Sequence, residues 1–190
     1  MKIADGSFAQ CFNAQAVVDD GRQVIVATDL NNCAADSQML VAMTEQTIAN
    51  TGDAPKQFLA DAGYWSESNM KAVTDITEQT GTDFLIATGR LSHDETVPAA
   101  PRGRIPKDLT PKQRMARMLR TKPGRAAYAR RKVIVEPAFG QIATLQGKHV
   151  LLRGLDNARG EWKLLAACHN LRKLYGHVGT AGLGSLRPAA

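Results

Sequence analysis

The stretch Lys56-Gln57-Phe58-Leu59-Ala60-Asp61-Ala62-Gly63 lies at the centre of a regular alternation of strand-like and helix-like segments. Its first five residues predict a short strand, and Asp61-Ala62-Gly63 predicts a turn. A helix that Ser66 opens and Gly81 stops is expected next, and then a strand over residues 83–87. Strands that alternate with helices predict an α/β fold.

Two further strands are expected upstream of this stretch. Residues 11–18 and 23–30 are strand-like, and Asp19-Asp20-Gly21 between them predicts a hairpin turn. Asp36 is expected to cap a helix that ends at Gly52. A hairpin followed by helix–strand–helix–strand predicts a mixed rather than an all-parallel sheet, and this order is compatible with an RNase H-like fold.

Downstream, residues 88–124 form a basic segment in which proline and glycine exclude a regular element as far as Pro111. A basic helix is expected from Thr110-Pro111 to Arg120, followed by a turn at Lys122-Pro123-Gly124. We predict one domain over residues 1–178, with 88–124 as an insertion, and a flexible tail over 179–190.

The secondary structure around Glu136 is ambiguous. Val133-Ile134-Val135 favours a strand, and Pro137 disfavours helical geometry at the residue before it, so a strand and a kinked helix both remain open. The last element is clearer. A helix over 157–175 is predicted from an apolar stripe at helical spacing, with these members: Leu164, Cys168, Leu171 and Tyr175.

Charge indicates a polyanionic partner. The 190 residues carry a net charge of +6 with a pI near 9.4. Between Arg90 and Lys132 there are 13 basic and 3 acidic residues, and such clustering is typical of proteins that bind phosphate backbones. No apolar run is long enough for a membrane span, and no secretory signal is visible, so we expect a cytoplasmic protein without a membrane partner.

Two carboxylates are candidates for chemistry. Asp61 follows a predicted strand, and ligands of open α/β sheets collect at the carboxyl ends of strands. An aspartate at this point can bind a hard cation, but it can equally be an ordinary turn residue. Glu136 follows three basic residues, so an ion-pair role is the alternative there. Neither residue alone decides the function.

The two residues together belong to a larger pattern. Leu59-Ala60-Asp61-Ala62-Gly63-Tyr64 and Tyr128-x-x-Arg131-x-x-x-x-Glu136-Pro137-x-Phe139-Gly140 resemble segments of DDE-type transposases of bacterial insertion sequences. Three flanking segments are similar to the family as well: Phe12-Asn13-Ala14-Gln15-Ala16-Val17-Val18-Asp19, Arg153-Gly154-Leu155 with Glu161-Trp162, and His169-Asn170-Leu171-Arg172-Lys173-Leu174. The resemblance covers residues 3–177.

The resemblance implies an RNase H-like catalytic domain, with Asp61 and Glu136 as the second and third catalytic carboxylates and as metal ligands. It favours a kinked helix around Glu136. It also implies that Tyr128 and Arg131 hold DNA phosphates, and we expect Arg125, Arg130 and Lys132 to contribute to the same contact. The family's cofactor is Mg²⁺, because two divalent cations stabilise in-line attack on a phosphodiester and prefer oxygen ligands. A homodimer is expected by the same analogy.

Two departures from the family pattern bear on activity. The first catalytic aspartate lies on a central strand that precedes the Asn-Ala-Gln segment by more residues than this chain has, so we expect that strand and that aspartate to be absent. Asp5, Asp19 and Asp29 are weak substitutes. Ala143 stands where the family usually has a lysine, which predicts the loss of a phosphate contact.

Three hypotheses follow. The chain is a transposase fragment that is inactive by itself, or a non-catalytic DNA-binding regulator that uses the basic segment, or an α/β protein whose basic loop is merely solvated. Binding of DNA with a steep salt dependence separates the first two from the third. Metal-dependent nicking of DNA separates the first from the second.

Overall fold

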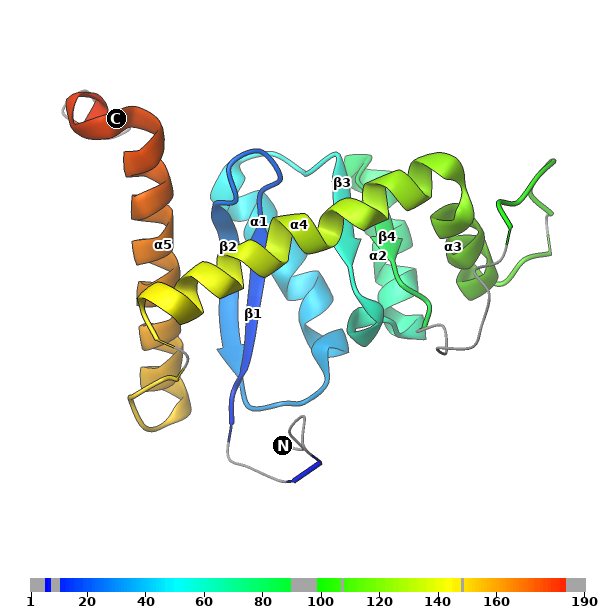
Figure 1. Cartoon of the computed structure of the whole chain (residues 1–190). Helices are drawn as coiled ribbons and strands as arrows, with labels where there is room; N and C mark the ends of the chain where they lie inside the picture. Colours follow the sequence, from blue (N-terminus) through cyan, green and yellow to red (C-terminus); the bar gives the residue numbers. More distant parts are fainter. Residues whose placement is uncertain (1–5, 8–10, 90–98, 107, 148, 184–190) are drawn as a thin grey trace. The chain divides into compact units, whose positions relative to one another are not determined.

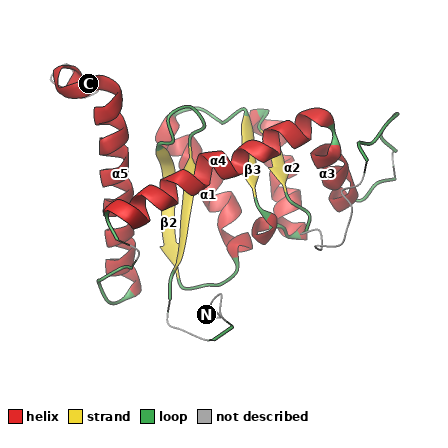
Figure 2. Cartoon of the chain, in the orientation of Figure 1, coloured by secondary structure: helices red, strands yellow, loops and turns green. Residues whose placement is uncertain are grey.

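The computed structural model describes residues 6–7, 11–89, 99–106, 108–147 and 149–183. The chain divides into two compact units, the first formed by Met1–Cys33 and Ile134–Ala190 and the second by Ala34–Val133. Helices and strands alternate as expected, and the mixed α/β composition is consistent with an RNase H-like domain (Figures 1 and 2). The described strands form two separate two-stranded sheets rather than one continuous mixed sheet.

The first unit is built on the predicted hairpin. Strand β1 (Asn13–Val18) pairs antiparallel with β2 (Ile25–Asn31). Asp19 organises the turn, because its carboxylate accepts a hydrogen bond from the Arg22 amide at 2.8 Å. The predicted second strand began at Gln23, but Gln23 has a φ of 58° and belongs to the turn, so β2 starts two residues later.

Helix α5 (Leu155–Leu183) packs against this hairpin, and the core of the unit lies between them. Its buried members are Ile25, Leu30, Ile142, Ala158, Trp162 and Ala166. Trp162 stacks on Phe139 with ring centroids 5.7 Å apart. Small residues at two α5 positions let the helix approach the strands closely, while the indole fills the remaining volume.

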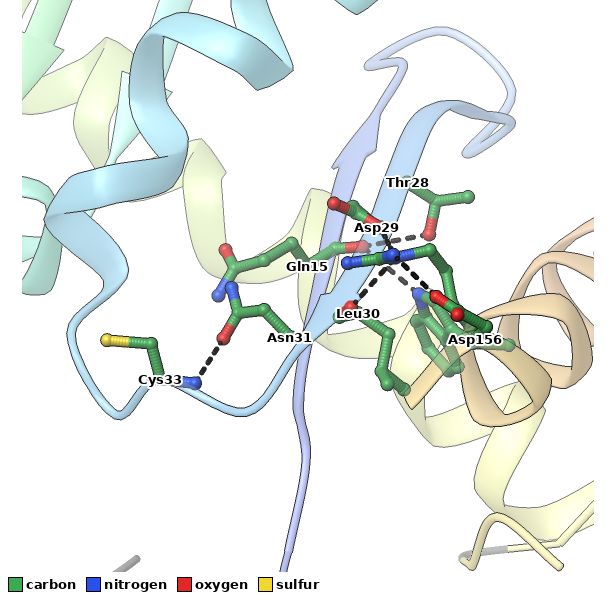
Figure 3. Close-up of polar contacts among 9 residues, drawn as sticks. Gln15, Thr28, Asp29, Leu30, Asn31, Cys33 and Asp156 are labelled. Atoms are coloured by element: carbon green, nitrogen blue, oxygen red, sulfur yellow. Dashed lines mark hydrogen bonds and ion pairs between the residues drawn. The ribbon is translucent and has the colours of Figure 1, made fainter. Parts of the chain in front are cut away.

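Side chains of α5 also bind the backbone of the hairpin. Trp162 Nε1 donates to the Gln15 carbonyl (3.2 Å), and Arg159 Nε donates to the Leu30 carbonyl (3.1 Å) while it pairs with Asp29 at 2.7 Å. Figure 3 shows these contacts around Gln15, Asp29 and Leu30. At the other end of β2, His169 Nε2 lies 2.8 Å from the Gln23 carbonyl. The helix is therefore fixed by direction-specific hydrogen bonds as well as by apolar packing.

Three expectations for the first unit need correction. The helix predicted from the apolar stripe forms, but three members of that stripe are exposed: Leu164, Leu171 and Tyr175. The packed face of the helix carries other residues: Ala158, Trp162, Ala166 and His169. Helix α5 continues to Leu183 with a break at Gly179, so the segment 179–190 begins inside it, and residues 184–190 lie outside the described part. The strand alternative around Val133-Ile134-Val135 is wrong, because that segment is helical.

That segment belongs to helix α4 (Lys122–Leu145), which contains Pro137 and whose residues are divided between the two units. Proline inside a helix removes one backbone hydrogen bond and is tolerated only where other contacts outweigh the loss. Buried Ile134, Ala138 and Ile142 recur every four residues and supply such contacts. The predicted turn at Lys122-Pro123-Gly124 is instead the first turn of this helix, where proline is accepted.

The second unit contains a β–α–β element. Strand β3 (Gln57–Ala60) pairs in parallel with β4 (Asp83–Ile86), and α2 (Glu67–Thr80) connects them. Phe58 and Phe84 pack against each other across the two strands, with ring centroids 5.4 Å apart and the ring planes tilted by 31°. Ser66 caps α2 through its side chain, and Gly81 ends it in the left-handed conformation, both as predicted.

A short 3₁₀ helix η1 (Asp36–Met39) leads into α1 (Leu40–Thr51), which ends at Gly52 as predicted. Asp36 does not cap a helix, because the cap position is Ala35 and no side-chain cap hydrogen bond forms. Helix α3 (Pro111–Arg120) begins with a complete capping box between Thr110 and Gln113. In the described part of the chain, no helix has both the length and the apolar character that crossing a bilayer requires.

Candidate active site

Asp61 lies directly after β3, at the carboxyl end of that strand, as the sequence predicts. It is followed by the 3₁₀ helix η2 (Ala62–Tyr64), and its Oδ1 accepts a hydrogen bond from the Gly63 amide at 2.9 Å. Asp61 therefore does stabilise the turn that follows β3. It uses one carboxylate oxygen, and the side chain remains 45% exposed, so Asp61 can also bind a ligand.

The structure brings Asp61 together with two residues of the second motif. Arg131 Nη1 lies 3.8 Å from Asp61 Oδ2, and the Arg131 guanidinium lies 5.6 Å from the centre of the Tyr128 ring. Tyr128 and Arg131 are three residues apart on α4, so both project from the same side of that helix. A carboxylate, a cation and a phenol therefore meet from segments that are distant in sequence.

Asp36 is a second carboxylate at this site, whereas its position in the sequence predicts a helix cap. A Cβ placed on Gly63 would lie 2.5 Å from Asp36 Oδ2 and 3.1 Å from Asp61 Oδ1. The sum of these distances limits the separation of the two carboxylate oxygens to at most about 5.6 Å. Only glycine leaves room for both carboxylates here. In the sequence, Gly63 lies in the same motif as Asp61, but that motif does not identify Asp36 as a neighbour of Asp61.

Asn69 holds the two carboxylate-bearing segments together. Its side chain is buried, and its Nδ2 donates to the Ser37 carbonyl and to the Tyr64 carbonyl, each at 2.7 Å. These bonds join η1, which carries Asp36, to η2, which follows Asp61. No sequence pattern identified Asn69, because a single asparagine inside a predicted helix has no distinctive spacing.

Two tyrosines border the carboxylates and have perturbed pKa values. Burial, together with the negative charges of Asp36 and Asp61, raises the pKa of Tyr64 well above its ordinary value, and the charge of Arg131 opposes this only in part. Burial also raises the pKa of Tyr128, and Arg131 again acts in the opposite direction. Both phenols therefore stay protonated at neutral pH.

The donor chemistry of this cluster fits a hard divalent cation. Asp36 and Asp61 offer carboxylate oxygens, which Mg²⁺ prefers, and it keeps several waters where protein ligands are few. Within the described ranges, no group of three or more His, Cys, Asp or Glu side chains is arranged to hold a metal ion.

The other predicted site residues have these positions. Glu136 lies on α4 with an exposed side chain and is assigned to the first unit, whereas Asp61 belongs to the second. Arg125, Arg130 and Lys132 are exposed on α4. Two of the aspartates considered as substitutes have other contacts: Asp29 pairs with Arg159, and Asp19 stabilises the hairpin turn. Asp5 lies outside the described residues.

The second unit thus gathers two carboxylates, an arginine and a tyrosine around the segment that follows β3 in an α/β domain. The family model described as Transposase DDE domain matches residues 2–171. The chain therefore belongs to the DDE transposase family, whose members carry out DNA transposition. No curated protein and no solved structure matches the chain.

Proposed function

We propose that this chain binds DNA and that Asp61 and Glu136 are two of the carboxylates of a metal-dependent phosphodiester-cleaving and strand-transferring site. The observation that carries this proposal is the meeting of Asp61, Arg131 and Tyr128. These residues come from two separate segments that both match the family pattern, and their proximity is what a site that holds metal next to phosphate requires.

Each residue has a distinct role in the proposal. Asp61 and Glu136 bind Mg²⁺, which when bound activates the attacking oxygen and neutralises the developing charge. Arg131 and protonated Tyr128 hold the phosphate by charge and by hydrogen bonding. The exposed cations Arg125, Arg130 and Lys132 bind phosphates of the neighbouring DNA backbone.

The charge of α3 supports a DNA partner for the second unit. This helix contains four basic residues and no acidic one: Lys112, Arg114, Arg117 and Arg120. None of the four forms an ion pair with another described residue. Arg117 instead donates to three carbonyl oxygens of the preceding loop, those of Arg102, Gly103 and Arg104. The positive charge of α3 is thus not neutralised within the described chain.

We further propose that the 190-residue chain by itself does not cleave DNA. Two-metal catalysis needs several converging carboxylates, and the family pattern matched in this sequence supplies two, Asp61 and Glu136. Ala143, in place of the family's lysine, is proposed to cost one phosphate contact. The homodimer and the cytoplasmic location remain predictions.

The test combines three measurements on the whole chain. Fluorescence anisotropy with a labelled duplex at increasing salt should show affinity that falls linearly on logarithmic axes. Calorimetric titration with Mn²⁺ should show binding that Asp61→Asn abolishes. A nicking assay with Mg²⁺ should show no cleavage. Absence of DNA binding at low salt would refute the proposal, and cleavage by the chain alone would refute its second part.

A non-catalytic DNA-binding regulator is the alternative, and the uncompensated charge of α3 favours it equally. It shares DNA binding with the first proposal and differs in the metal. A chain that binds DNA with full affinity but binds no Mn²⁺, and whose DNA affinity is unchanged in Asp61→Asn, would be such a regulator.

A further inference from the structure

Arg131 makes fewer hydrogen bonds than its guanidinium can donate. The group has five N–H donors, and its Nε is buried without a hydrogen-bond partner among the described residues. The approach to Asp61 is 3.8 Å, which is long for a charge-assisted hydrogen bond. The Tyr128 ring lies 5.6 Å from the guanidinium carbon, and the guanidinium also interacts with the Tyr128 hydroxyl, whereas Nε has no such partner.

Asp61 is correspondingly exposed to competing cations. Oδ1 is engaged by the Gly63 amide, and Oδ2 faces Arg131. Asp36 Oδ2 lies at most about 5.6 Å from Asp61 Oδ1, so Arg131 stands beside two negative charges. A divalent cation and the guanidinium would therefore compete for the same carboxylates. The two positive charges would repel each other strongly at short distance, because water is partly excluded there.

We propose that Arg131 couples DNA binding to metal binding: it neutralises the Asp61 carboxylate until a DNA phosphate draws its guanidinium away. This inference rests on the proposed function. A phosphate offers Arg131 a bidentate partner that satisfies donors which Asp61 leaves unused. The transfer frees Asp61 Oδ2 and raises its affinity for the metal. Binding linkage is reciprocal, so metal binding raises DNA affinity by the same factor.

The experiment measures Mn²⁺ affinity calorimetrically on the whole chain, with and without a saturating short duplex of mixed sequence at low salt. In the native chain, DNA should raise Mn²⁺ affinity at least about fivefold, the lower end of ordinary coupling. In Arg131→Gln, Mn²⁺ affinity without DNA should already be raised by a similar factor, and added DNA should raise it no further. DNA affinity is measured in the same preparations by anisotropy.

Lys71→Gln is the control. It removes one positive charge from an exposed position of α2 in the same unit, to which no role in DNA or metal binding is assigned, and it should keep the coupling at its native size. Circular dichroism establishes that the variants are folded. If Arg131→Gln does not fold, Arg131→Met makes the same comparison, because its unbranched side chain still packs on the Tyr128 ring.

Equal Mn²⁺ affinity of the native chain and Arg131→Gln without DNA would overturn the inference, as would full coupling in Arg131→Gln. In both cases the metal and DNA assignments of the proposed function would stand. Absence of Mn²⁺ binding in every variant would overturn the inference and the metal assignment together. A loss of coupling in Lys71→Gln as large as in Arg131→Gln would show a general charge effect and would also overturn the inference.

Discussion

Asn170 makes two hydrogen bonds to the backbone of Ile25, a residue 145 positions earlier in the chain. Its Oδ1 accepts from the Ile25 amide at 2.8 Å, and its Nδ2 donates to the Ile25 carbonyl at 2.8 Å. These are the donor and acceptor that another strand would use at the edge of β2. The amide of one side chain thus occupies the position of a strand and closes that part of the sheet edge.

Asn170→Ala should lower the free energy of unfolding by about 2–4 kcal/mol, because it leaves a partly buried donor and acceptor without partners. Denaturant titration followed by circular dichroism measures the change. Arg172→Ala, at an exposed position of the same helix, should change the free energy by less than about 0.5 kcal/mol. Equal effects of the two substitutions would contradict the structural role of Asn170.

Trp162 combines a hydrogen bond with packing, and two substitutions separate them. Trp162→Phe removes the bond to Gln15 but keeps a ring next to Phe139, so it should cost about 1–3 kcal/mol. Trp162→Ala also opens a cavity in the core and should cost about 3–5 kcal/mol. Thermal and denaturant unfolding measure both values. An equal cost for the two variants would mean that the ring contributes nothing beyond its hydrogen bond.

Gly63→Ala should weaken metal binding more than it weakens the fold. The added Cβ would meet Asp36 Oδ2 at 2.5 Å and Asp61 Oδ1 at 3.1 Å, and the ends of these side chains can move aside at small cost in stability. We expect a change of less than about 1 kcal/mol in unfolding and a loss of about tenfold or more in Mn²⁺ affinity, which is about 1.4 kcal/mol. Calorimetry on the folded variant checks this. If Gly63→Ala bound Mn²⁺ with native affinity, the close approach of Asp36 and Asp61 would not be required for metal binding.

Tyr64 should make stability fall in alkali. Burial raises its pKa in the folded state above the ordinary value of 10.0, so the unfolded chain loses the phenolic proton first as the pH rises. Its contribution is complete below pH 10 and is lost progressively above it. Unfolding titrations between pH 8 and about 11 should show a decline that Tyr64→Phe reduces. The same decline in Tyr64→Phe would assign the effect to other groups.

The order of helices and strands could be predicted because it depends on local signals. Ser66 and Gly81 mark the ends of α2, and the Asp19 turn marks the hairpin, through bonds between neighbouring residues. Around Pro137 these local signals conflicted. The helix forms there because Ile134, Ala138 and Ile142 are buried at helical spacing, and that burial depends on the rest of the fold.

The packed face of α5 shows the same limit. Apolar spacing alone favoured Leu164, Leu171 and Tyr175, which are exposed, whereas Trp162 and His169 are buried. Trp162 and His169 each have a polar atom that must find a partner when buried, and the hairpin backbone supplies it. A pattern of hydrophobic residues cannot reveal those partners, because they lie more than a hundred residues away.

By itself, the sequence determined the α/β class, the positions of most elements and the place of Asp61 directly after a strand, because turn chemistry, periodicity and motif spacing are properties of short segments. Only the tertiary structure decided that Arg131 lies against Asp61, that Asp36 shares the space beside Gly63, and that Asn69 ties their segments together. Contacts of this kind are fixed when distant segments pack, since direction and distance in space, rather than residue type, select the partners.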